Sequence, residues 1–82
     1  MLNWTPNFVA LLPLDLQLTN LIISKLKRHE LKQGDLLPAV RELSNQTLVS
    51  VFVIQQAYSK LKIMGIINTD IINENPILTY NQ

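Results

Sequence analysis

The sequence predicts a small, mainly α-helical domain with one β-hairpin, an α+β arrangement in which three helices precede two strands. Leucine and isoleucine recur at intervals of three and four through residues 14–64, which is typical of helices that bury one face. Residues 66–80 instead contain two short β-branched segments around an asparagine-rich turn. The chain has 82 residues, 48% of them hydrophobic and 16% charged, which suits one domain with one core.

We divide the chain into an N-terminal arm, residues 1–12, and a domain formed by residues 13–82. Trp4 and Phe8 of the arm are expected to cap the core, and an arm exchanged between two protomers is the alternative. The arm lacks the basic start of a signal peptide, and its apolar run is too short for one. Because the chain also has no cysteine and no long apolar stretch, we expect a cytoplasmic protein without a membrane segment.

The first helix is predicted over about residues 14–29. Its apolar stripe consists of Leu14, Leu18, Leu21, Ile22 and Leu26. Pro13 and Asp15 suit the helix start. The further apolar residues Leu16 and Ile23 are candidates for a homodimer face.

The second helix is predicted over about residues 38–46, after a turn at residues 33–35. Gly34 can adopt the positive φ that such a turn requires. Pro38 is expected in the first helical turn, where its missing N–H would have no partner in any case. Val40 and Leu43 are expected to face the core.

The third helix is predicted over about residues 51–64, with Ser50 as its N-cap and Gly65 just beyond its end. Its inward stripe is expected to be Ile54, Ala57, Tyr58, Leu61 and Met64. A hairpin, or wing, is predicted over about residues 66–80. Three helices and a hairpin, with a short connector between the second and third helices, form a winged helix-turn-helix plan.

Two linked stretches also resemble a known family. The segment Leu31–Leu43, LKQGDLLPAVREL, is similar to the pattern LKPGDxLPSxREL of GntR-type bacterial transcriptional regulators. The later pattern of that family is matched by Val49-Ser50, Ala57-Tyr58, Leu61 and Gly65-Ile66-Ile67. The resemblance covers about two-thirds of the chain, and its spacing is free of insertions between Pro13 and Ile67.

The resemblance implies a fold and a role. A domain of this type is the DNA-reading part of a dimeric regulator, with its third helix in the major groove of double-stranded DNA and its wing near the minor groove. An effector-binding or dimerisation domain usually follows it in the family. We therefore expect a sequence-specific, DNA-binding transcriptional regulator that acts as a homodimer.

The chain departs from the family where the DNA is read. After Val-Ser the family commonly has Arg/Pro-x-Thr-Val-x-Arg, whereas residues 51–56 here are VFVIQQ. In the DNA-binding interpretation, Gln55 or Gln56 pairs with adenine, and Phe52 packs on a thymine methyl group. Arg41, retained from the family motif, would contact a phosphate together with Ser50 and the helix N-termini. The predicted DNA-binding residues are Arg41, Ser50, Phe52, Gln55, Gln56 and Ser59.

The alternative is a winged-helix interaction module that has lost DNA binding. Phe52, Val53 and Ile63 would then form an exposed apolar patch for a protein partner. Arg41 would form a solvated pair with Glu42 or Asp35, which contributes little. The family resemblance favours DNA, because sequence readout depends on variable side chains on a fixed scaffold.

Net charge neither supports nor excludes DNA binding, and the placement of the charges tells more. The net charge is only +1, and the segment from Asn68 to Gln82 has no basic residue and no glycine. Asp70 and Glu74 would repel phosphate, while Asn73 and Asn75 could still donate hydrogen bonds. We expect the wing to be mainly structural and any DNA complex to depend on the third helix.

No enzyme, cofactor or metal site is expected. The six carboxylates are scattered, and neither a phosphate-binding loop nor a metal-ligand spacing is present. The only histidine, His29, is expected to complement the dipole at the end of the first helix.

Overall fold

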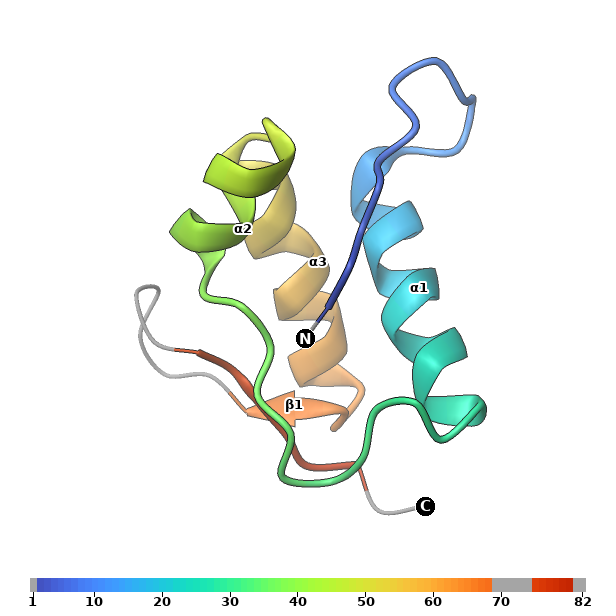
Figure 1. The fold of residues 1–82 in the computed structure, drawn as a ribbon, viewed down its shortest axis with the longest axis vertical. Helices are drawn as coiled ribbons and strands as arrows, with labels where there is room; N and C mark the ends of the chain where they lie inside the picture. Colours follow the sequence, from blue (N-terminus) through green and yellow to red (C-terminus); the bar gives the residue numbers. More distant parts are fainter. Residues whose placement is uncertain (1, 69–74, 81–82) are drawn as a thin grey trace.

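The computed structural model describes residues 2–68 and 75–80 (Figure 1). The helices are α1 (Leu14–Lys27), α2 (Val40–Thr47) and α3 (Val51–Ile63), and the strands are β1 (Ile67–Asn68) and β2 (Ile77–Leu78). The strands pair antiparallel, with Ile67 opposite Leu78. The predicted order of three helices and a hairpin is confirmed. No helix within the described ranges has the length and apolar character needed to cross a membrane.

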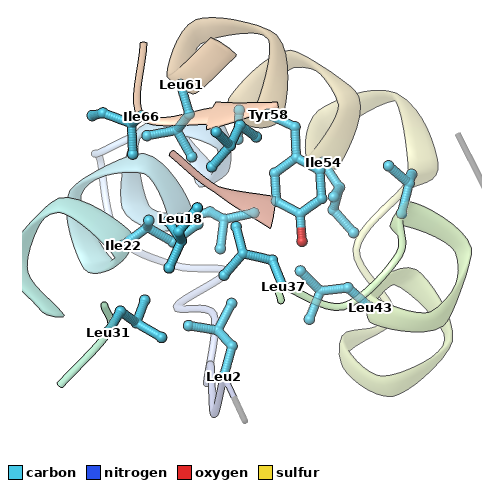
Figure 2. Close-up of a cluster of buried hydrophobic side chains, with 14 of the residues drawn as sticks. Leu2, Leu18, Ile22, Leu31, Leu37, Leu43, Ile54, Tyr58, Leu61 and Ile66 are labelled. Carbon is cyan, nitrogen blue, oxygen red and sulfur yellow. The ribbon is translucent and has the colours of Figure 1, made fainter. Parts of the chain in front are cut away.

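Helix α3 lies at the centre of the packing, because it contacts α1, α2 and β1. Its buried side chains point into one cluster with residues of the other two helices and the wing (Figure 2). Four members of the predicted stripe are buried, namely Ile54, Ala57, Tyr58 and Leu61. The expectation for Met64 is wrong, since this side chain is 54% exposed. The helix ends at Ile63 with Met64 as its C-cap, and Gly65 follows with a left-handed φ of +77°.

The N-terminal arm packs on this core with its first residues. Leu2 is buried, and Trp4 is partly buried against the same cluster, as expected for an aromatic cap. The corresponding expectation for Phe8 is wrong, because this ring is 60% exposed. The side chain of Gln17 in α1 fixes the following bend: its amide donates to the carbonyl oxygens of Asn7 (3.0 Å) and Leu12 (2.8 Å).

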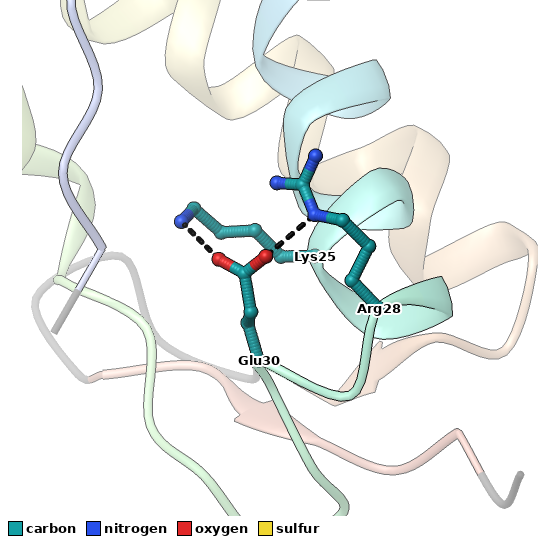
Figure 3. Close-up of polar contacts among 3 residues, drawn as sticks. All are labelled: Lys25, Arg28 and Glu30. Atoms are coloured by element: carbon teal, nitrogen blue, oxygen red, sulfur yellow. Dashed lines mark hydrogen bonds and ion pairs between the residues drawn. The ribbon is translucent and has the colours of Figure 1, made fainter.

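Helix α1 ends two residues earlier than predicted. Arg28 is its C-cap, and His29 adopts a left-handed φ of +60°, which terminates the helix. Just beyond, Glu30 accepts hydrogen bonds from Lys25 (3.2 Å) and Arg28 (2.5 Å), as Figure 3 shows. The hydrogen bond from Lys25, followed by that from Arg28, makes the largest contribution to holding the pKa of Glu30 below its usual value. These contacts join the reversed chain to the last turns of α1.

Helix α2 begins two residues later than predicted, at Val40, and Pro38 lies ahead of its N-cap, Ala39. Hydrogen bonds to distant parts of the chain explain why α2 begins later than predicted. The Pro38 carbonyl accepts a hydrogen bond from the buried Tyr58 hydroxyl at 2.7 Å, and the preceding Leu37 amide donates to Pro76 at 2.8 Å. Both bonds hold the residues before α2 in an extended connection between α3 and the wing.

This extended connection also widens the wing. Gly34 donates to the Leu78 carbonyl (2.8 Å), and the Leu78 amide donates to Asp35 (2.9 Å). An antiparallel bridge pairs Leu36 with Ile77. Strand β2 therefore lies between β1 and residues 34–36, a contact that the sequence analysis did not anticipate.

The connector between α2 and α3 is tightly bonded. Leu48 takes a left-handed φ of +63° while its side chain is 86% exposed, a conformation that is costly for a branched residue. The Ser44 hydroxyl donates to the Val49 carbonyl at 2.6 Å. Ser50 is the N-cap of α3, as predicted, and its hydroxyl accepts from the Val53 amide at 3.2 Å. These bonds fix the angle at which α3 leaves the turn.

The Tyr58 hydroxyl gives a first prediction. Burial, and secondly the charge of Glu42, raise the pKa of Tyr58, so the folded state favours the neutral phenol. Tyr58→Phe leaves the Pro38 carbonyl unpaired and should lower the free energy of unfolding by about 1–3 kcal/mol in urea titrations at neutral pH. The wild-type advantage should be complete below about pH 10, the usual pKa of tyrosine, and should shrink as the pH rises above it.

The matched control is Tyr80→Phe, because Tyr80 is the only other tyrosine and is 45% exposed. It should leave the free energy of unfolding unchanged. Equal effects of the two substitutions would contradict the role given to the Tyr58 hydroxyl.

Candidate nucleic-acid interface

The exposed face of α3 carries most of the predicted DNA-binding residues. Phe52 is 64% exposed, and Gln56 and Ser59 are exposed on the same side of the helix. Together with Gln55, which is half-buried, and with Lys60, they line one open depression. The structure therefore brings four of the six predicted residues into a single hollow on one helix.

Arg41 and Ser50 do not line this depression. Arg41 is exposed at the second position of α2, and this residue takes part in a further interaction. The hydroxyl of Ser50 is used as the cap of α3, so this residue positions the helix. The amides of Val51 and Phe52 precede the capped amide of Val53, and amides at such positions have no partner within a helix.

Lys60 is a residue of this surface that the sequence analysis missed. It follows Gln56 by four positions, a spacing that places two side chains on the same helical face and could have revealed it. Its ammonium group is engaged: the Nζ atom lies 2.6 Å from Oδ2 of Asp15 in α1. The hydrogen bond from Lys60 holds the pKa of Asp15 below its usual value. The ion pair joins the first turn of α1 to α3 at the edge of the depression.

The apolar patch of the alternative interpretation is not continuous. Val53 is only partly exposed and packs against the core. Ile63 is 86% exposed but lies eleven residues beyond Phe52, or about 16 Å along the helix. Gln56 and Ser59 lie between them, so the exposed face of α3 is largely polar.

The described part of the wing, residues 75–80 with β1, has a structural role. The side-chain amide of Asn75 donates to the Leu37 carbonyl at 2.8 Å, which uses one of its hydrogen-bond donors within the domain. Asp70, Asn73 and Glu74 lie outside the described residues. Within those residues, no group of three or more His, Cys, Asp and Glu side chains could hold a metal ion.

The comparison with protein families decides the assignment. Residues 14–70 match the family described as "Bacterial regulatory proteins, gntR family". The chain belongs to the gntR family. The matched range includes all three helices, so the winged helix-turn-helix is a GntR-type domain of a DNA-binding transcriptional regulator.

Relatives of the GntR domain agree with this assignment. An uncharacterized HTH-type transcriptional regulator of Bacillus subtilis (strain 168), YhcF, is 44% identical over 57 residues, which is 70% of this chain and 47% of that protein. The chain thus spans about half the length of its curated relative. The family and this relative are transcription regulators and not enzymes.

Solved structures share the fold. YtrA from Sulfolobus acidocaldarius, a GntR-family transcription factor, superimposes with a TM-score of 0.80 at 26% identity, covering 93% of this chain and 79% of that one. The structure of AraR(DBD) in complex with operator ORX1 gives a TM-score of 0.72 at 22% identity, covering 95% of this chain and 93% of that one. Because the identity to AraR(DBD) is only 22%, this similarity shows a shared fold and nothing about function.

Proposed function

We propose that this GntR domain reads double-stranded DNA by placing the exposed face of α3 in the major groove. The observation that carries the proposal is the depression where Phe52, Gln55, Gln56 and Ser59 meet on one helix. A major groove admits one α-helix and presents hydrogen-bonding base edges and thymine methyl groups. The face of α3 offers amide, hydroxyl and aromatic groups that match both kinds of contact.

Each side chain has a distinct role in this proposal. The exposed carboxamide of Gln56 can accept from N6 and donate to N7 of one adenine. Phe52, one turn earlier, would pack on a thymine methyl group, and Ser59, one turn later, would bond a neighbouring base edge. Gln55 is half-buried, which limits it to the edge of the contact.

Phosphate contacts would come from around this reading face. We assign them to Arg41 on α2 and to the first two amides of α3, which Ser50 positions. Three such contacts are few for a DNA-binding protein, and the net charge of +1 is correspondingly small. We therefore expect modest affinity that depends strongly on the sequence read by α3.

The oligomeric state and the cellular location are also part of the proposal. We infer a homodimeric regulator in the bacterial cytoplasm, where its DNA lies. Two copies of α3 would read half-sites about 34–36 Å apart, as in other helix-turn-helix dimers.

Fluorescence anisotropy with a labelled DNA duplex tests the function. Of the assigned phosphate contacts only that of Arg41 is cationic, so log K should fall with log salt at a slope of about −0.9, or roughly threefold between about 50 and 200 mM salt. Arg41→Ala should weaken binding to all sequences alike, and Gln56→Ala should cost about 1–3 kcal/mol at one base position only. The matched controls, Arg28→Ala and Gln33→Ala, lie away from the depression and should bind like the parent.

Absence of binding at low salt by the folded domain would overturn the DNA-binding proposal. A parental binding profile for both Arg41→Ala and Gln56→Ala would show that the reading surface lies elsewhere.

The Asp15–Lys60 pair gives a separate prediction. Asp15→Asn releases the ammonium group of Lys60 at the edge of the depression and should steepen the salt slope by about one contact. The gain should disappear in the Asp15→Asn/Lys60→Gln double variant, measured by anisotropy in the same salt series. An equal gain with and without Lys60 would mean that the loss of the Asp15 carboxylate, and not the release of Lys60, strengthens binding.

A further inference from the structure

A second hollow lies at the other end of α3 from its capped N-terminus. It is a cleft of about 420 Å³ lined by residues at the ends of α1 and α3 and in the described end of the wing. Figure 1 shows where these segments lie in the fold. The lining of the cleft consists of Ile23, Leu26, Lys27, His29, Met64, Ile66 and Tyr80. The DNA-reading face shares none of these residues, so the cleft has no part in the proposed function.

The floor of the cleft is apolar. Leu26 and Ile66 are buried in the core, and Ile23 packs partly against it. Met64 forms a wall with its side chain 54% exposed. A thioether is flexible and makes favourable contacts with aromatic rings. The volume is within the range of small-molecule sites, about 300–1,000 Å³.

The rim carries a cation and hydrogen-bond donors. Lys27 is exposed in the last turn of α1, and no ion pair of its side chain is found among residues 2–68 and 75–80. The nearby carboxylate of Glu30 is already bridged by Lys25 and Arg28 (Figure 3). Lys27 thus places its ammonium group beside an apolar floor, and His29 and Tyr80 line the same cleft.

We propose that this cleft binds a small aromatic carboxylate of one or two rings. The ring system would lie on Leu26 and Ile66, against the thioether of Met64 and the 45%-exposed ring of Tyr80. The carboxylate would pair with the ammonium group of Lys27 at the rim. The ammonium group at the rim repels a cation and gives an anion an advantage over a neutral ligand of the same shape.

Methyl-¹³C-methionine NMR tests the proposal, because the chain has only two methionines and one of them lines the cleft. The probe is 2-naphthoate, and 2-naphthamide is its uncharged analogue. Naphthoate should shift the Met64 methyl signal saturably through the ring current, and the signal is assigned by its loss in Met64→Leu. The amide should bind about tenfold more weakly, as expected when a charge-assisted bond is lost.

A pair of variants locates the carboxylate. Lys27→Gln should weaken naphthoate about tenfold and leave naphthamide unchanged. Lys32→Gln removes the same charge from a residue that does not line the cleft, and it should bind naphthoate like the parent.

Three results would overturn the proposal: no saturable shift at any soluble naphthoate concentration, equal binding of acid and amide, or equal effects of the two lysine variants. A Met64 shift that depends on protein concentration and not on naphthoate would also overturn it and indicate a contact between two copies of the chain. None of these readouts involves DNA, so failure here is distinguishable from failure of the proposed function.

Discussion

The burial of one stripe of α3 constrains the rest of the domain. Ile54, Ala57 and Leu61 are fully buried between α1, α2 and β1. The Tyr58 hydroxyl also fixes the rotation of the helix, because it bonds the chain just ahead of α2. A helix that buries this stripe must present the opposite face to solvent, and that face holds the proposed DNA-reading residues. One face of α3 therefore packs in the core, and the opposite face carries the proposed DNA-reading residues.

The sequence predicted the fold well where local chemistry decides it. Apolar periodicity located the three helices, and the Ser50 hydroxyl caps α3 as its residue type indicated. Helix ends were less accurate, because they depend on distant bonds. Pro38 looked like a helix start, yet its carbonyl is held by Tyr58, twenty residues away. The bridge between Leu36 and Ile77 likewise joins segments whose contact no local pattern reveals.

The candidate site was likewise predictable where helical spacing decides it, and not where distant contacts do. Phe52, Gln56 and Ser59 could be placed together from helical spacing alone, and the structure places them in one depression. Lys60 satisfies the same spacing, but its engagement by Asp15 depends on how α1 packs against α3. Residues 51–56 lack the guanidinium and hydroxyl groups common at these positions in the family. Amides and one aromatic ring suit base recognition better than phosphate attraction, so the proposed function predicts specificity ahead of affinity.

The central claim is that the exposed face of α3 is the surface that meets DNA. Chemical-shift mapping tests it most directly: the ¹⁵N-labelled domain is titrated with a DNA duplex at low salt, and the amides that move are located. We predict that shifts concentrate at the start of α3 and in the side-chain amides of Gln55 and Gln56, while Ile66 and Tyr80 at the opposite end stay unchanged. Shifts confined to the opposite end, with the side-chain amides of α3 unmoved, would contradict the account.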